Sequence, residues 1–245
     1  MVKFILATAL LALSNLSSAS PAPAKTEGGP NGRYRLYNNL FGSGAPGTSG
    51  SQKTWATFYN GLTIKWETQF HWSGNPSVVK SYANVALRKG LPRRVTAIRS
   101  IPTVWEWHPD EAGLPDADVS YDLWLSYNPK SSSASSDSTV EIMIWIGHHI
   151  AVPSGMRLTV ARIDGRLWTL FKGYVGTWTV YTFVAPSNIY NYHADLKWFL
   201  TYLHLSYCVD LNQYLVEVQA GTEPFIGSSK ITTTKYRVEV NPPVH

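Results

Sequence analysis

The sequence contains a single cysteine, Cys208, among 245 residues. One cysteine cannot close an internal disulfide, so a disulfide-stabilised scaffold is excluded. CxxC pairs of the kind used by redox and zinc sites are absent for the same reason. We expect Cys208 to be a buried apolar filler and not a nucleophile.

Charged residues are also scarce, at 15% of the chain, where about 25% is usual for a globular protein. The net charge of +5 and the isoelectric point near 9.2 could suggest a nucleic-acid partner. The basic residues are dispersed, however, and no nucleic-acid-binding module surrounds their one cluster. We therefore expect no nucleic-acid partner. The clustered residues are Arg88, Lys89, Arg93, Arg94 and Arg99.

No apolar run is long enough to span a bilayer, which needs about 20 residues. The first 20 residues instead have the pattern of a secretory signal, with Lys3, an apolar stretch over 4–13 and small residues at 17–19. Residues 21–31 are rich in Pro, Ala and Gly and predict a disordered mature N-terminus. The sequence thus predicts a secreted protein with no membrane partner and a single domain over 32–245.

Aromatic residues are abundant, with 10 Trp, 14 Tyr and 8 Phe. Short β-branched and aromatic runs recur between turn residues, as in a two-sheet sandwich. One segment has helical periodicity, with apolar residues at 196, 199, 200 and 203 and Asp195 expected in its first turn. This pattern predicts an all-β sandwich or jelly roll with one packed helix. The predicted strands, besides 33–37, are 62–72, 78–87, 95–107, 119–127, 139–146, 157–163, 167–174, 178–184, 214–220 and 230–240.

The run over 139–147 places a carboxylate within a β-branched strand. Alternation sends Glu141, Met143 and Trp145 to one face, and the three isoleucines between and after them to the other. The isoleucine face suits a core. The opposite face suits the floor of a cleft for a neutral, flat-faced substrate, although a lone strand glutamate is more often simply solvent-facing.

Two further acids lie on the non-core faces of other strands. In 118–125, Asp122 shares a face with Ser120 and Trp124. In 214–225, Glu217, Gln219 and Glu223 lie opposite the predicted core side, and Pro224 is expected to end the strand just after Glu223. The predicted core side of this strand consists of Tyr214, Val216, Val218 and Ala220.

Carboxyl groups of unequal pKa are what cleavage of a glycosidic bond requires. One attacks the sugar while the other protonates the departing oxygen. Taken singly, each acid has the alternative role of a solvent-facing strand residue. Other chemistries find no support, since HExxH and GxSxG motifs are absent. His148 and His149 are adjacent and are expected in a loop, so we predict no metal and no cofactor.

Two motifs about eighty residues apart resemble the signature strands of glycoside hydrolase family 12. They are Glu141-Ile-Met-Ile-Trp145 and Gly221-Thr-Glu-Pro-Phe-Ile-Gly227. Shorter matches run through most of the chain from 37 onwards. These are at 37–40, 72–74, 79–82, 100–102, 119–123, 183–185 and 194–196.

The resemblance implies a β-jelly roll of two antiparallel sheets whose concave sheet forms a cleft for an extended glucan. It implies a retaining endo-β-1,4-glucanase or xyloglucanase with Glu141 as nucleophile and Glu223 as acid/base. Asp122 matches the family's aspartate beside the nucleophile. Met143 and Trp145 match cleft-lining positions, and Asn39 matches one that contacts a glycone sugar.

Three departures from the family pattern concern the cleft and the fold. Phe41 stands where the family usually has a stacking Trp. The early cysteine pair is absent, with Lys53 at the position expected for one partner. The segment 147–155 is shorter than usual and lacks Gly-Pro-Ile-Gly.

The leading hypothesis is a secreted, monomeric hydrolase of plant-wall glucans: cellulose, mixed-linkage glucan or xyloglucan. A non-catalytic β-glucan-binding protein with the same cleft is the main alternative. A surface or effector protein recognised by a plant, whose role does not depend on hydrolysis, is the third possibility.

Overall fold

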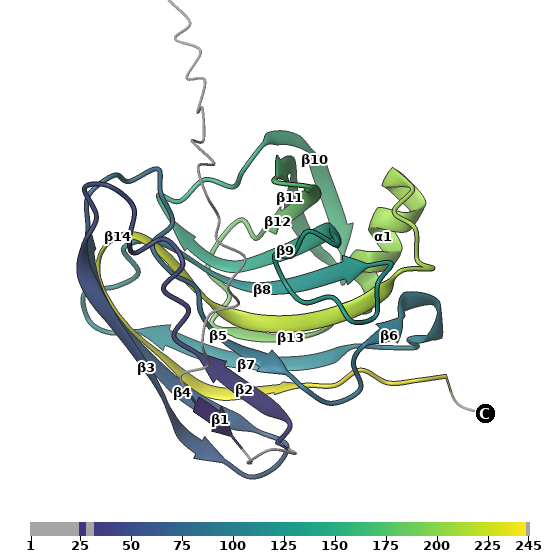
Figure 1. Ribbon diagram of the computed structural model, residues 1–245, viewed down its shortest axis with the longest axis horizontal. Helices are drawn as coiled ribbons and strands as arrows, with labels where there is room; N and C mark the ends of the chain where they lie inside the picture. The colour runs from purple at the N-terminus through teal and green to yellow at the C-terminus, as the bar shows by residue number, and fades with distance from the viewer. Residues whose placement is uncertain (1–24, 28–31, 244–245) are drawn as a thin grey trace, which may run out of the picture.

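The computed structural model describes residues 25–27 and 32–243, which form two stacked β-sheets and one helix (Figure 1). We call the two sheets the cleft sheet and the back sheet. The cleft sheet has the order β1 (Lys25–Glu27), β2 (Tyr34–Tyr37), β5 (Ala83–Leu87), β14 (Tyr214–Val238), β8 (Asp116–Ser126), β9 (Ser138–His149), β12 (Trp178–Val184), β11 (Arg166–Val175) and β10 (Met156–Ile163), with β6 (Arg93–Arg94) also on β14. The back sheet contains β3 (Ser49–Tyr59), β4 (Ile64–Ser73), the second half of β14, β7 (Pro102–Pro109) and β13 (Asn191–Asp195).

The predicted all-β sandwich with one helix is confirmed. Its strands pair antiparallel with one exception, because β12 lies parallel to β9. That pairing sets Val180 beside Glu141 and Val184 beside Trp145. It brings a strand from nearly forty residues further along the chain to the middle of the cleft sheet.

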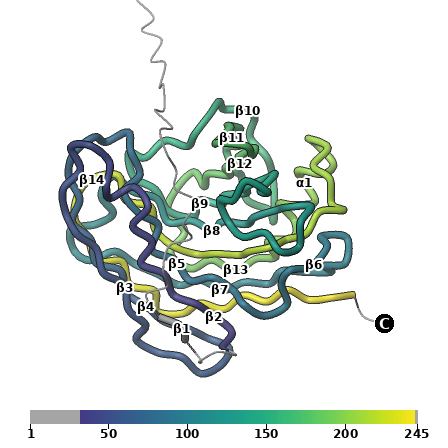
Figure 2. Tube along the Cα trace, viewed as in Figure 1, coloured from purple at the N-terminus to yellow at the C-terminus, as the bar shows by residue number. Residues whose placement is uncertain are grey.

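Strand β14 belongs to both sheets and can be followed as the yellow segment in Figure 2. Its first half pairs with β5 and β8, and its second half with β4 and β7. The prediction that Pro224 ends this strand is wrong, because the residue sits at a bulge between Pro224 and Ile226, where proline is tolerated. Gly227 follows with φ +108°, and a Cβ there would lie 2.6 Å from Cβ of Pro115.

Large aromatic side chains fill the space between the sheets. Trp105 lies edge-on to Tyr121 with ring centroids 4.9 Å apart, and Tyr236 lies edge-on to Trp66 at 5.4 Å. Such edge-to-face pairs contribute about 0.5–1.5 kcal/mol each beyond the burial of their area. This core holds the curved cleft sheet in place from behind.

Helix α1 (Lys197–Tyr207) covers the part of the cleft sheet that the back sheet leaves open. Phe199 packs edge-on against Trp168 at 5.1 Å and Phe183 at 5.0 Å. Asp195 precedes the helix and does not lie in its first turn, but its Oδ1 accepts the amide of Lys197 at 2.9 Å. No helix in the described part of the chain is long and apolar enough to cross a membrane.

Several predicted boundaries are wrong for local reasons. The segment predicted as a strand over 95–107 begins with a short 3₁₀ helix, η2 (Val95–Ala97), and the strand starts at Pro102. The segment predicted over 78–87 becomes a strand only at Ala83. Strands β3, β6 and β13 were not predicted. The reason for β3 is that it is largely exposed and rich in Ser, Thr and Gly.

Two expectations about the chain ends and Cys208 also need correction. Within the tail expected to be disordered, Lys25–Glu27 pairs with β2. The signal over 1–20 and the rest of that tail lie outside the described residues. Cys208 is exposed, not buried, and ends α1 in a left-handed conformation.

Candidate active site

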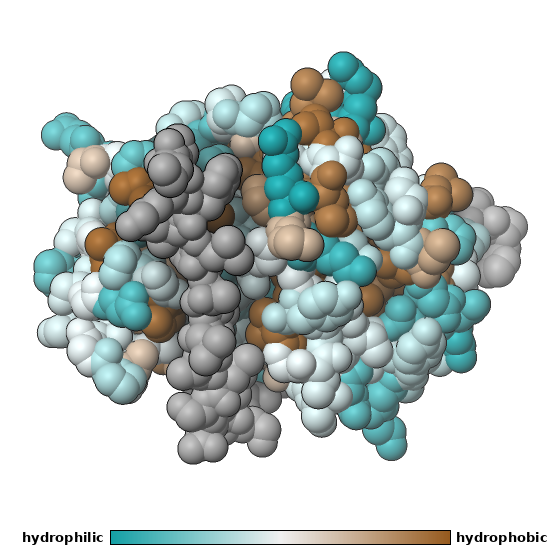
Figure 3. Space-filling model, turned by 90° about the horizontal axis from the view of Figure 1, so that it is seen from above, coloured by the Kyte–Doolittle hydropathy of each residue, from teal (hydrophilic) through white to brown (hydrophobic). Residues whose placement is uncertain are grey.

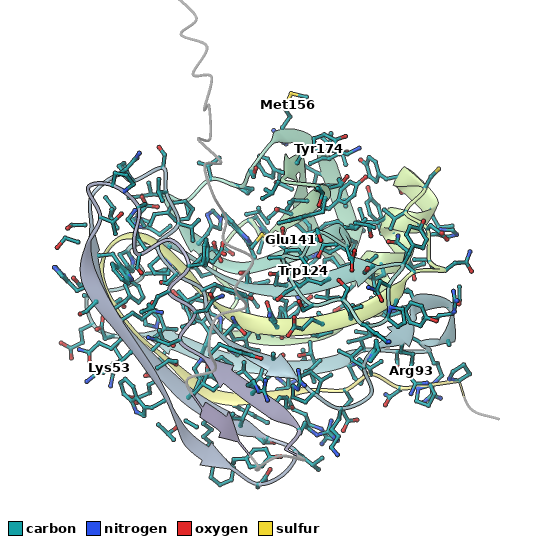
Figure 4. The ribbon with its side chains drawn as sticks, in the orientation of Figure 1. Lys53, Arg93, Trp124, Glu141, Met156 and Tyr174 are labelled. Atoms are coloured by element: carbon teal, nitrogen blue, oxygen red, sulfur yellow. The ribbon has the colours of Figure 1, made fainter. Side chains whose placement is uncertain are left out.

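On β9, Glu141, Met143 and Trp145 lie on the face turned away from the core between the sheets, as their alternation predicts. Met143 and Trp145 are buried in an apolar cluster on this side of the sheet, together with Trp124 and Trp178. The three isoleucines of β9 belong to the core between the sheets. Figure 4 shows Glu141 beside Trp124 over the middle of the cleft sheet, whereas Lys53 and Arg93 lie at the outside of the molecule.

Glu141 is partly open to solvent and held by two neighbours. The indole nitrogen of Trp178 donates to its Oε2 at 2.7 Å, and the carboxyl of Asp122 lies within hydrogen-bonding reach. Burial raises the pKa of Glu141 to about 7, against the opposing effect of these two hydrogen bonds. Both neighbours favour the ionised form, which a nucleophile needs.

Asp122 lies directly beside this glutamate on β8 and is almost fully buried. Its Oδ2 accepts the indole N–H of Trp124 at 2.9 Å, and its Oδ1 has no partner apart from that carboxyl in the described chain. Burial raises the pKa of Asp122 well above its usual range, and the charges of Glu141 and Glu223 raise it further. Burial and these charges therefore favour keeping a proton on the pair formed by Asp122 and Glu141.

Glu223 reaches the same cleft from β14. Register places it opposite Asp118 on β8, and burial raises its pKa well above the ordinary value, as do the charges of Asp118 and Glu141. The structure thus brings Glu141, Asp122 and Glu223 into one electrostatic cluster, as predicted. Burial raises the pKa of both glutamates, but hydrogen bonds lower that of Glu141 while neighbouring charges raise that of Glu223 further.

The predicted alternation of β14 gives the correct face for its glutamates but the wrong face for its first two predicted core residues. A bulge between Leu215 and Glu217 shifts the alternation by one residue. As a result Leu215, not Tyr214, enters the core, and Val216 packs against the cleft cluster. Val218 and Ala220 lie in the core as predicted.

The serine-rich loop between β8 and β9 rests on the cleft side of β14. Glu217 Oε2 accepts the amide of Ser133 at 2.9 Å, and Gln219 Nε2 donates to Ser133 Oγ at 3.3 Å. Both of these β14 side chains are buried beneath the loop. The loop is thereby tied across the strand that carries Glu223.

Two further regions concern the residues predicted to bind substrate and a hollow near the end of β9. Asn39 accepts the amide of Tyr82 through its carbonyl at 2.9 Å, and Phe41 is 52% exposed. Beyond the end of β9 a hollow of about 410 Å³ is lined mainly by apolar side chains, including Ile150, Val152 and Phe171. This hollow lies beside the acids and not over them. Figure 3 looks onto this side of the molecule and shows brown apolar patches separated by polar surface.

The model of glycosyl hydrolase family 12 matches residues 32–241. The chain belongs to this family. It is 36% identical over 246 residues to a probable xyloglucan-specific endo-β-1,4-glucanase A of Aspergillus clavatus, covering 98% of this chain and 100% of that one. It is 39% identical over 215 residues, covering 86% of this chain and 87% of the relative, to a Phytophthora nicotianae protein named as an inactive glycoside hydrolase. The structure of Trichoderma harzianum endoglucanase 3, of family GH12, has a TM-score of 0.79 at 35% identity, covering 86% and 92% of the two chains.

Sequence reasoning missed several residues of this family 12 cleft. Trp178 was placed on a strand but not at the site, because its contact with Glu141 spans 37 positions. Asp118 and Glu217 were seen on their strands and left out of the site. Asp118 lies four residues before Asp122 and so shares its face of the strand, which could have assigned it to the site. The tie between Glu217 and Ser133 depends on how a loop folds and has no sequence signal.

His148 and His149 were expected in a loop, but they end strand β9, and the ring of His148 lies 6.3 Å from that of Trp145. Across the described residues, no group of three or more His, Cys, Asp or Glu side chains is arranged to hold a metal ion.

Proposed function

We propose that this protein is a secreted endo-β-1,4-glucanase that cleaves plant-wall glucans with retention of anomeric configuration. Glu141 is the nucleophile, Glu223 the acid/base, and Asp122 the group that holds the proton beside the nucleophile. The observation that carries the proposal is the contrast between the two glutamates in one cleft. The hydrogen bonds that Glu141 receives from Trp178 and Asp122 lower its pKa, whereas the charge and hydrogen bond of Asp118 raise the pKa of Glu223.

The mechanism follows from these two environments. In the first step, Glu141 attacks the anomeric carbon while Glu223 gives its proton to the departing glycosidic oxygen. The product is a glycosyl ester on Glu141 and a free chain end. In the second step, Glu223 takes a proton from water as the water oxygen attacks the same carbon and releases Glu141. The double inversion restores the original configuration.

The surroundings of the acids support a neutral glycan as substrate. Trp124, Met143, Trp145 and Trp178 provide an aromatic and thioether floor, which suits the C–H faces of sugar rings. Phe41 and Asn39 lie in the segment that the family resemblance assigns to a glycone subsite. We propose β-1,4-linked glucose backbones as the substrate class, with xyloglucan included because several relatives carry that specificity in their names.

Release of new reducing ends from xyloglucan, mixed-linkage β-glucan and carboxymethylcellulose tests the activity. The expected result is release from at least one of them, accompanied by a fall in viscosity that marks internal cleavage. Proton NMR of the first products should show the β anomer before mutarotation, and an initial α anomer would contradict retention. Glu141→Gln should lower turnover by about 10³-fold or more while keeping the fold.

The rival function is binding of β-glucan without hydrolysis. The relative named as inactive keeps this alternative open, because its overall identity matches that of relatives named as enzymes. Binding to insoluble glucan with no reducing-end release by wild-type protein would favour the rival. A plant-directed role independent of hydrolysis would persist in Glu141→Gln.

A further inference from the structure

Asp118 is a buried carboxyl that the proposed reaction does not yet use. It lies on β8 four residues before Asp122, on the same face, and its relative exposure is 0%. Register sets it opposite Glu223 on β14 and opposite His148 on β9. The carboxyls of Asp118 and Glu223 lie within hydrogen-bonding reach of each other.

The two oxygens of Asp118 have different surroundings. Ser120 donates its hydroxyl to Oδ1 at 2.7 Å. Oδ2 is buried and, within residues 32–243, has no partner other than the Glu223 carboxyl. A buried carboxyl oxygen left without a donor is costly, so a proton between the two acids is the arrangement that satisfies it.

The same design occurs at Asp122. There, too, a donor two residues further along β8 holds one oxygen, in this case the indole of Trp124 at 2.9 Å. The other oxygen is again free to share a proton with a glutamate of the proposed dyad, here Glu141. Strand β8 thus carries two aspartates four residues apart. Each accepts a hydrogen bond from the side chain two residues after it, and each faces one glutamate.

We propose that Asp118 is a positioning residue for Glu223, whose carboxyl it holds through a shared proton while Ser120 holds Asp118 itself. This inference rests on the proposed function, because it assigns Glu223 the role of acid/base. It adds a second carboxyl pair to the one formed by Asp122 and Glu141. The consequence is that the proton needed by the leaving oxygen is already located and oriented in the empty cleft.

The electrostatics of the pair agree with this arrangement. Burial raises the pKa of Asp118 to about 8, and the hydrogen bonds from Ser120 and Glu223 oppose the rise. The charge of Asp118 in turn raises the pKa of Glu223. Both shifts favour keeping a proton on the pair, because burial penalises two adjacent carboxylate charges.

Other ionisable groups surround the pair and enter any titration of it. Tyr82 is fully enclosed and donates its hydroxyl to the carbonyl of Ser120 at 3.2 Å. Lys80 is also buried, but its ammonium donates to two backbone carbonyls at 2.6 Å. The groups packed around the pair are Asp122 from β8, Glu141 and His148 from β9, and Lys80 and Tyr82 from the segment before β5.

Asp118→Asn tests the proposal. The amide keeps the size of the side chain but removes the negative charge and the shared proton. The pKa of Glu223, followed by carbon NMR with labelled glutamate carboxyls, should fall by about one unit or more. The pH profile of kcat/KM on soluble glucan should also move by about one unit, since its limbs report coupled groups. Asp164→Asn, in the β10–β11 turn at φ +52°, is the matched control and should leave both measurements unchanged.

Ser120→Ala is the second variant, and it keeps both carboxyls. Loss of its hydroxyl removes a hydrogen bond that favours ionised Asp118, so the first titration of the pair should move to higher pH. A Glu223 pKa that stays within about 0.3 units in Asp118→Asn would overturn the proposal, as would an unmoved first titration in Ser120→Ala. Because NMR needs no turnover, this outcome can be told apart from a failure of the proposed hydrolase activity.

Discussion

The indole nitrogen of Trp178 donates a hydrogen bond to Oε2 of Glu141 over 2.7 Å, linking two parallel neighbouring strands at the centre of the cleft. Trp178 is itself held edge-on to Trp124, with ring centroids 5.3 Å apart. One aromatic residue therefore contributes both to the floor of the cleft and to the charge state of the proposed nucleophile.

Replacing Trp178 by Phe should make Glu141 harder to ionise. The hydrogen bond lowers the pKa of Glu141 from the value that burial alone would give, so its loss should raise this pKa above about 7. The acidic limb of kcat/KM should then move up by about one pH unit, with the largest loss of activity on the acid side. Trp198→Phe, on the exposed side of α1, is the control. An unmoved acidic limb in Trp178→Phe would contradict this assignment.

Glu141→Gln should change how stability depends on pH. In the wild type, the unfolded chain ionises Glu141 near its ordinary value of 4.5, whereas the folded protein does so only near 7. The wild type therefore loses stability as pH rises through this window, and a glutamine does not. The variant's advantage should grow from near zero at pH 4 to on the order of 1–3 kcal/mol at pH 8.

Thermal unfolding at the two pH values provides the measurement. A gain of about 1 kcal/mol corresponds to roughly 2–4 °C for a chain of this size. Glu111→Gln is the control, since Glu111 is an exposed surface residue. An equal difference between variant and wild type at pH 4 and pH 8 would show that the fold does not resist the ionisation of Glu141.

Phe41 offers a test of the glycone subsite. It is 52% exposed in a segment beside the cleft and presents a smaller face than a tryptophan. Phe41→Trp should lower KM for unbranched glucan by roughly two- to tenfold with little change in kcat, and Phe41→Ala should raise it, since stacking adds about 0.5–1.5 kcal/mol. Phe58→Ala on the back sheet is the control. A KM that changes in neither Phe41 variant would remove Phe41 from the substrate path.

The tie between Glu217 and Ser133 should control the mobility of the loop between β8 and β9. Glu217→Ala removes the acceptor of the Ser133 amide, so hydrogen exchange at that amide should accelerate by about tenfold or more. Glu217→Gln retains an acceptor oxygen and should exchange nearly as slowly as the wild type. Equal exchange in the alanine and glutamine variants would mean that other contacts hold the loop.

Most of the fold and the three proposed acids could be predicted from sequence because strand alternation is strict where one face is deeply buried. The run from Glu141 to Trp145 is the clearest case. The prediction failed on β14 because a bulge at Leu215 shifts the period, and because a proline at position 224 was expected to end a strand that continues. Trp178 and Asp118 were not assigned to the site, since their partners are set by register between distant strands.

The continuity of β14 has a consequence for the molecule as a whole. The residues after Gly227 carry no proposed catalytic group, yet they close the back sheet with the same strand that presents Glu223. Cutting the chain near Gly227, or adding residues there, would therefore change the orientation of the Glu223 carboxyl as well as the packing of the back sheet. Attempts to divide this hydrolase into complementing halves near Gly227, or to join a fusion partner there, should therefore fail. An insertion at the exposed β10–β11 turn should leave both sheets intact.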